Sequence, residues 1–356
     1  MADRDPKNPF DSEAFAESTE TKAQRGRQKP GEPADGEQPL GPLVTVFVLN
    51  WNRKADLLEA LASVRRQTYR PIEMLVVDNG SKDGSAEAVE GEYPEARLVR
   101  LNRNYGCPGG RNRGIAEARG EFIFFLDNDG VLHERAIEHA VKRILAHPRI
   151  AVVSAKTVYY QTGEESFLFG KEATKINQPF FSNRFSGGAS LHRAAVYGEV
   201  GIYPDDYMYG GEEADLALRL LDHGYFIQYA PEVIMYHKVL NTARDRSREF
   251  LHLCCNALTT AWRLWPIELA VAYTLTGSLA QGRRAWRQGW LQPWLTDSPR
   301  RCGRIFKAIR ERRPVRRSTM VYRLRLNGSY PDSPLPYPEK VSLTDYLKAI
   351  IRSRSG

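Results

Sequence analysis

Residues 121–130, EFIFFLDNDG, join five large apolar residues to two acids that are spaced one residue apart. An apolar run of this length is typical of a strand buried on both faces of a parallel sheet. On an extended backbone residues i and i+2 project to the same side, so Asp127 and Asp129 would point together from the strand end. Their repulsion favours a bound cation, and Mg²⁺ or Mn²⁺ suits oxygen ligands. A turn in which Asp and Asn serve only as hydrogen-bonding residues explains the motif equally well.

Two more apolar runs upstream end in polar residues. Residues 43–49 end at Asn50-Trp51-Asn52, and residues 72–77 end at Asp78. A helix with one apolar face is expected between them. Strands that alternate with helices predict a parallel sheet covered on both sides, and ligands bind such sheets at the carboxyl ends of the strands. Three polar strand ends therefore predict the rim of a binding site.

A glycine-rich stretch, residues 104–114 (NYGCPGGRNRG), follows a short predicted strand at 98–101. We expect a loop here that enters a helix at 114–119, and its backbone N–H groups and Arg111 would suit a phosphate. The stretch lacks the Gly-Lys-Ser/Thr of a P-loop and the G-x-G-x-x-G of dinucleotide-binding proteins. By itself it is weak support for nucleotide binding.

Acidic residues begin a second predicted helix, in residues 210–219 (GGEEADLALR). Glu212, Glu213 and Asp215 suit the helix dipole, which is a purely structural explanation. They also suit a general base at the edge of a glycine-rich loop. His237 ends the apolar run 231–237, and a lone histidine of this kind is more often structural than a ligand.

The charge of the chain is uneven. Residues 281–325 hold fourteen Lys and Arg against two acids, a local +12 within a total of +8, and they include Trp286, Trp290 and Trp294. Such a segment can meet anionic lipid or nucleic acid, although a solvated helix face is as common. Four cysteines without a CxxC pair argue against disulfides or zinc and fit a reducing compartment. With no signal peptide and no apolar run of about 18 residues, we expect a cytoplasmic protein, free or peripheral on the inner face of the cell membrane.

Taken in order, the motifs resemble the family 2 glycosyltransferases of GT-A fold, within them the rhamnosyltransferase-like branch. The resemblance covers residues 43–240 and is carried by VTVFVLNWNR, VVDNGSKDGS, NYGCPGGRNRG, FLDNDG, GGEEADLALR and MYHK. It implies a Rossmann-like, mainly parallel sheet flanked by helices. Residues 1–42, rich in Glu, Lys, Pro, Gly and Ser, are expected to be a disordered tail. Residues 241–356 are expected to form a helical, basic C-terminal region that contacts a membrane or an acceptor.

The resemblance also implies roles for individual residues. Asp78 would bind the nucleotide base, Asp127 would lie near the ribose, and Asp129 would bind the Mg²⁺ or Mn²⁺ that bridges the diphosphate. The remaining expected contacts are with Asn50 and Asn52 in the base pocket, Arg111 and Asn112 near the nucleotide, and His237 in the metal shell. Glu213 aligns with the catalytic base, usually an aspartate, and Glu212 is the alternative. The implied reaction moves a sugar from a nucleotide-diphosphate sugar to a hydroxyl of a saccharide or lipid-linked acceptor, with inversion, in cell-envelope polysaccharide or glycolipid synthesis.

Two other functions compete with this one. A sugar nucleotidyltransferase would carry a G-x-G-T/S-R-L loop after the first strand, and residues 50–53 (NWNR) do not match it. A basic membrane- or nucleic-acid-binding protein on a GT-A-like scaffold would account for the Arg- and Trp-rich segment. Of these two partners we expect an anionic membrane surface, and we expect no nucleic acid.

Overall fold

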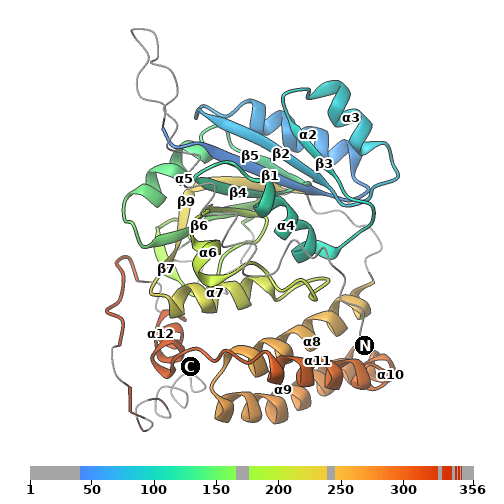
Figure 1. Ribbon diagram of the computed structural model, residues 1–356, viewed down its shortest axis with the longest axis vertical. Coiled ribbons are helices and arrows are strands. Elements are labelled where there is room, and N and C mark those ends of the chain that lie inside the picture. Colours follow the sequence, from blue (N-terminus) through green and yellow to red (C-terminus); the bar gives the residue numbers. More distant parts are fainter. Residues whose placement is uncertain are drawn as a thin grey trace, which may run out of the picture.

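The computed structural model describes residues 41–165, 176–238, 245–327, 331–338, 341–342, 344 and 346. Within them one sheet of nine strands has the order β3-β2-β1-β4-β8-β6-β9-β5, with β7 paired to β9 (Figure 1). The strands are β1 (Val44–Asn50), β2 (Ile72–Asp78), β3 (Arg97–Arg100), β4 (Phe122–Asp127), β5 (Gly130–Leu132), β6 (Ile150–Tyr159), β7 (Phe180–Ser182), β8 (Ala189–Arg193) and β9 (Phe226–His237).

The predicted apolar runs form the parallel part of this sheet. Strand β1 lies between β2 and β4, and its register pairs Asn50 with Asp78 and Leu49 with Asp127. The polar residues that follow the three runs therefore reach the same edge of the sheet, which confirms the predicted GT-A-like arrangement. Most of the sheet is parallel. It is nevertheless mixed, because β8 enters antiparallel between β4 and β6.

Side chains that alternate along the strands pack into two separate hydrophobic cores. Val44, Val46 and Val48 face one core, and Phe47 faces the other. The first core is covered by α2 (Lys54–Arg65), α3 (Ser85–Glu92) and α5 (Ala136–Leu145). The second core is covered by α4 (Gly106–Glu117), α6 (Val196–Val200) and α7 (Glu212–Asp222). Successive side chains of a strand point to opposite faces of the sheet, and these strands are apolar on both faces. Each face therefore needs its own layer of helices.

The glycine-rich stretch differs from the prediction, because α4 begins at Gly106 rather than near residue 114. The backbone N–H of Cys107 donates to Met208 O, so the helix start is tied to the segment before α7. A Cβ at Gly110 would overlap the side chain of Leu49. A Cβ at Gly114 would likewise overlap the ring of Phe47. The glycines therefore allow a helix to lie directly against β1.

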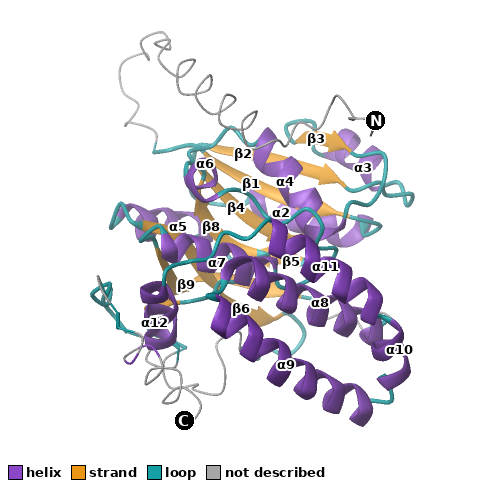
Figure 2. Cartoon of the chain, turned by 60° about the horizontal axis from the view of Figure 1, so that its bottom comes forward, coloured by secondary structure: helices purple, strands orange, loops and turns teal. Residues whose placement is uncertain are grey.

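The C-terminal region is helical, as expected, and forms a layer below α7 (Figures 1 and 2). It comprises α8 (Arg246–Leu264), α9 (Ile267–Arg287), α10 (Leu291–Thr296), α11 (Ser298–Arg310) and α12 (Arg317–Leu326). Helix α8 packs against α7, α9 and α11. No described helix combines the length and apolarity needed to cross a bilayer. The boundaries expected near residues 42 and 240 stay predictions, and residues 1–40 and 239–244 lie outside the described residues.

Candidate active site

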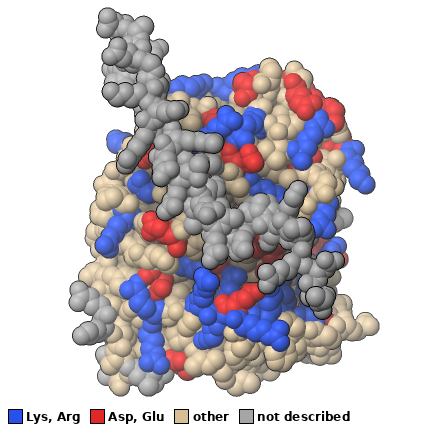
Figure 3. Space-filling view, viewed as in Figure 1, with Lys and Arg blue, Asp and Glu red and all other residues tan. Residues whose placement is uncertain are grey.

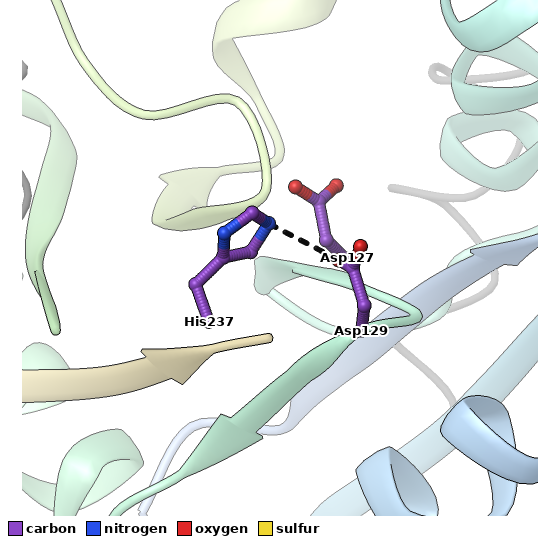
Figure 4. A group of neighbouring side chains, drawn as sticks. All are labelled: Asp127, Asp129 and His237. Atoms are coloured by element: carbon purple, nitrogen blue, oxygen red, sulfur yellow. Dashed lines mark ion pairs between the residues drawn. The ribbon is translucent and has the colours of Figure 1, made fainter. Parts of the chain in front are cut away.

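Three candidate ligands meet at the carboxyl edge of the sheet. Asp127 ends β4, His237 ends β9, and Asp129 lies in the turn between β4 and β5. Strand β5 pairs with the end of β9 and brings Gly130 opposite His237, which carries Asp129 to the histidine. One ligand atom from each of the three side chains lies within 4.8 Å of the others, and His237 Nε2 is 3.2 Å from Asp129 Oδ1 (Figure 4). The two carboxylates and one imidazole match the donor set of a small divalent cation.

The Arg53 guanidinium also faces this cluster. Its Nη1 donates to Asp129 Oδ2 at 3.0 Å and lies 3.5 Å from Asp56. Asp129 is nearly buried, so its negative charge needs a compensating cation. The loop after β1 therefore supplies a positive charge to the same carboxylate that is proposed to bind metal. The sequence motifs did not single out Arg53.

Asp127 is held against the backbone of Gly188. Its N–H donates to Gly188 O at 2.9 Å, and a Cβ at Gly188 would overlap its carboxylate. The side chain is 44% exposed and faces Arg111 Nη2 at 3.7 Å. Desolvation by the surrounding protein raises the pKa of Asp127, the Arg111 guanidinium opposes this, and the Asp129 charge adds to it. A carboxylate with this balance is stabilised by a further cation.

Arg111 links the two acidic motifs. Its Nη1 lies 3.2 Å from Glu212 Oε1 and 3.0 Å from Glu213 Oε1, and its side chain is buried. Helix α4 thus places one guanidinium between the end of β4 and the start of α7. The sequence predicted a place near the nucleotide for Arg111. The structure brings it to Asp127 and to both candidate bases.

The two glutamates differ in exposure. The side chain of Glu213 is 25% exposed, whereas that of Glu212 is 3% exposed. Burial and then the neighbouring Glu213 charge raise the pKa of Glu212 to about 7, although Arg111 lowers it. Among the described residues Glu212 Oε2 has no hydrogen-bond partner. A Cβ at Gly187 would overlap Glu213 Oε1, so Gly187 leaves room for the Glu213 carboxylate as Gly188 does for the carboxylate of Asp127.

In the predicted base pocket, the loops that follow the strands are joined by hydrogen bonds. Asp78 is buried, and its Oδ2 accepts from Ser81 N at 2.9 Å. Asn50 Nδ2 donates to Ser81 Oγ, and Asn50 Oδ1 accepts from Asn128 Nδ2 at 2.8 Å. Asn52 has a positive φ of 51°. Its Oδ1 accepts a hydrogen bond from Lys82 N in the loop after β2. The loops after β1, β2 and β4 are therefore fixed to one another around Asp78.

Asn112 of α4 forms hydrogen bonds with residues 203 and 205. Its Nδ2 donates to Tyr203 O at 2.9 Å and to Asp205 Oδ1 at 2.6 Å, and its Oδ1 accepts from Tyr203 N. All of these contacts are with the segment that leads to α7, and none is with Asp78 or the loop after β1. Nucleotide binding by Asn112 stays a prediction.

The segment 203–211, here called the 203–211 loop, is held by the C-terminal helices. Tyr207 Oη lies 2.6 Å from Thr260 Oγ1 and donates to Asn256 O at 3.1 Å. Asn256 Nδ2 donates to the carbonyls of Tyr209 and Gly210. Three cations of the C-terminal region form ion pairs next to this loop, Arg304 and Lys307 with Asp206 and Arg263 with Asp215. Part of the basic segment therefore supports the loop that precedes Glu212 and Glu213.

Comparison with known proteins agrees with this fold. Residues 45–196 match the model of glycosyl transferase family 2. The chain is similar to the N-acetylglucosaminyl-diphospho-decaprenol L-rhamnosyltransferase of Mycobacterium tuberculosis, at 24% identity over 285 residues, covering 67% of this chain and 91% of the relative. Two solved structures share the fold. GalNAc-T7 with UDP, GalNAc and Mn²⁺ has a TM-score of 0.54 and 15% identity over 65% of this chain and 49% of that one. The mannosyltransferase PcManGT of Pyrobaculum calidifontis with GDP-Man and Mn²⁺ has a TM-score of 0.51 and 20% identity. The match covers 83% of this chain and 95% of that one.

Proposed function

We propose that this chain, whose residues 45–196 match the model of glycosyl transferase family 2, moves a sugar from a nucleotide-diphosphate sugar to an acceptor hydroxyl with inversion. The observation that carries the proposal is the meeting of Asp127, Asp129 and His237 with Arg111 and Glu213 at one edge of the sheet. A turn with no ligand role would not require four separate segments, the β4–β5 turn, β9, α4 and α7, to converge there. The base pocket around Asp78 lies at the ends of the adjoining strands.

A divalent cation, Mg²⁺ or Mn²⁺, would be held by Asp129, Asp127 and His237. When bound, it would supply positive charge for the departing nucleoside diphosphate. Asp78 and Asn50 would contact the base, and Asp127 would lie near the ribose. Arg53 would add a second positive charge beside Asp129, because its guanidinium already lies 3.0 Å from that carboxylate.

Glu213 is the proposed general base. Its carboxylate is partly exposed and is oriented by Arg111, so it can accept the proton of an acceptor hydroxyl. Glu212 is a poorer candidate because its side chain is only 3% exposed and offers an acceptor hydroxyl little access, and its raised pKa leaves about half of it protonated near pH 7. Attack from the face opposite the leaving group would invert the anomeric configuration.

The acceptor is proposed to be a saccharide or lipid-linked saccharide of the cell envelope. The support is the similarity to the mycobacterial rhamnosyltransferase, whose name specifies a diphospho-decaprenol acceptor. A hexosyl or rhamnosyl donor would fit the same relative. The enzyme would then work at the inner face of the cell membrane.

A thermal-shift panel of UDP-, dTDP- and GDP-sugars, each with and without Mn²⁺, tests the proposal. One nucleotide class should raise the melting temperature of the wild-type protein, and the rise should depend on Mn²⁺. Asp129→Ala should abolish the Mn²⁺-dependent part, while the control Asp332→Ala, at an exposed aspartate, should retain it. If no donor stabilises the wild-type protein, the transferase proposal fails.

A further inference from the structure

Helix α9 has two apolar faces, and only one of them is packed. Its inward face is built from small residues, with Ala270, Gly277 and Ala285 buried, and Trp262 of α8 donates its indole N–H to Thr274. The outward face carries large apolar side chains that are 45–71% exposed, namely Ile267, Val271, Leu275, Leu279 and Trp286. We call these five residues the α9 apolar face. Exposed apolar side chains grouped along one helix mark a surface for a partner.

A groove continues this face into the protein. It has a volume of about 520 Å³ and is lined by Leu275, Ser278, Leu279, Gly282, Arg283, Trp286 and Trp294. A Cβ at Gly282 would lie 3.3 Å from the Trp294 ring, so the small residue keeps the helix close to α10. The floor of the groove is therefore apolar and aromatic. Figure 2 shows α9 as an outer helix of this layer with α10 at its end.

Positive charge borders the same surface. Arg283, Arg284 and Arg287 are exposed in the last turns of α9, and the nearest acid in sequence on that helix is Glu268 in its first turn. In Figure 3 the lower edge, where α9 runs in Figure 1, is largely uncharged, and Lys and Arg gather directly above it. An apolar helix face with tryptophan and bordering arginines is the composition of helices that lie in the headgroup region of anionic bilayers.

We propose that the α9 apolar face docks onto an anionic phospholipid membrane. Leu275 and Leu279 would enter the acyl region, Trp286 would lie at the headgroup level, and Arg283 and Arg287 would contact lipid phosphates. Nucleic acid is a poorer partner for this surface, because the exposed leucines gain nothing from phosphates or base edges. The inference deepens the proposed function, since an acceptor anchored in a membrane needs the enzyme at that surface.

Sedimentation of the full-length protein with vesicles tests the docking surface, and it needs neither donor nor acceptor. The wild-type protein should bind vesicles of phosphatidylcholine mixed with phosphatidylglycerol at low salt, and bind pure phosphatidylcholine weakly. Leu275→Ser with Leu279→Ser should weaken binding by about tenfold or more, because two apolar side chains no longer leave water. The matched control is Leu145→Ser, at a leucine of α5 that is 51% exposed and lies outside the C-terminal layer; it should bind as wild type does.

Two further measurements separate charge and folding from apolar contact. Arg283→Gln with Arg287→Gln should weaken binding to anionic vesicles about fivefold or more and reduce its dependence on salt. Arg119→Gln, at an exposed arginine of the family 2 domain, should leave it unchanged. Equal thermal melts for all variants would show that the fold is intact.

Three results would overturn the proposal. The first is no binding of the wild-type protein to anionic vesicles at low salt, and the second is unchanged binding by the double serine variant. The third is a wild-type dimer in light scattering that the serine variant converts to a monomer, because the face would then be covered by a second copy. Since the thermal-shift panel is run without vesicles, failure here leaves the transferase proposal standing, and the reverse also holds.

Discussion

At the scale of single residues, Arg111 determines how the acids of the site coexist. Three carboxylates lie within 3.7 Å of its guanidinium, and both Arg111 and Glu212 are nearly buried. Without this cation the buried negative charges would repel one another in a medium that screens them poorly. The residue is therefore needed for the fold of the site as well as for the orientation of Glu213.

Replacing Arg111 by Met should destabilise the protein by about 3–5 kcal/mol, since it leaves the buried Glu212 and the partly exposed Glu213 without a cation. The double variant Arg111→Met with Glu212→Gln should recover part of that loss, because one of the unpaired charges is gone. Urea unfolding of the two variants and of Glu212→Gln alone closes a double-mutant cycle. Strict additivity in that cycle would show that Arg111 and Glu212 are not coupled.

Glu212 should make stability depend on pH near neutrality. Its pKa is raised to about 7 by burial and by Glu213, so the folded protein holds a proton that the unfolded chain releases at lower pH. Stability should therefore fall as pH rises from about 4.5 to about 7, by at most roughly 3 kcal/mol from this group. Glu212→Gln should remove that fall. The free energy of unfolding of the variant should therefore exceed that of wild type most above pH ~7.

Isothermal urea unfolding at about pH 5 and about pH 8 measures this difference. Glu117→Gln, at an exposed glutamate of α4, serves as the control and should shift both values alike. If Glu212→Gln stabilises the protein equally at both pH values, Glu212 does not titrate in this window.

The sequence could select as candidates those residues that stand in a local motif. Asp127, Asp129, Glu212 and Glu213 could be selected because clustered acids at a strand end or a helix start suit a ligand site or a general base, although a turn or the helix dipole explains such acids as well. Arg53, Gly187 and Gly188 could not be selected, because their importance depends on which distant side chain approaches them in space. An arginine after a strand or two adjacent glycines are common in loops of any kind.

At the scale of elements, the parallel strands were predicted well and helix α4 was not. Long apolar runs specify buried strands through burial alone, so β1, β2 and β4 follow from composition. Glycine favours loops by local propensity, and α4 is a helix only because its glycines allow contact with Phe47 and Leu49. The antiparallel insertion of β8 is likewise set by pairing with β4 and β6, which no local pattern encodes.

Gly114→Ala should therefore destabilise the protein although alanine is the better helix former. The added Cβ would overlap the ring of Phe47, and overpacking of this kind costs about 1–3 kcal/mol. Gly91→Ala is the matched control, because Gly91 lies in α3 with open space around its Cβ position, and it should gain about 0.5–1 kcal/mol. Thermal and urea unfolding measure both, and a stabilised Gly114→Ala would contradict the close packing of α4 on β1.

At the scale of the whole molecule, the C-terminal helices support the candidate active site from outside the family 2 match. The 203–211 loop is joined to α8 through Tyr207 and Asn256 and to α11 through Asp206. Sequence reasoning predicted a helical, basic region, which is a property of composition. It could not predict that arginines and a lysine of this region would pair with Asp206 and Asp215, because these pairs join segments far apart in the chain.

Tyr207→Phe tests whether this support matters for catalysis. The change removes only the hydroxyl that contacts Thr260 and Asn256, so the loop before Glu213 should lose a fixed position while the donor pocket around Asp78 keeps its own hydrogen bonds. Because misplacement of a catalytic group lowers the rate more than it lowers substrate binding, kcat should fall about tenfold with donor affinity unchanged. Tyr225→Phe, which removes a hydroxyl contact with Glu199 away from the loop, should leave kcat near the wild-type value. A parallel loss of donor affinity in Tyr207→Phe would instead mean that the C-terminal helices support the sheet edge as a whole, and that the 203–211 loop is not a separately positioned element.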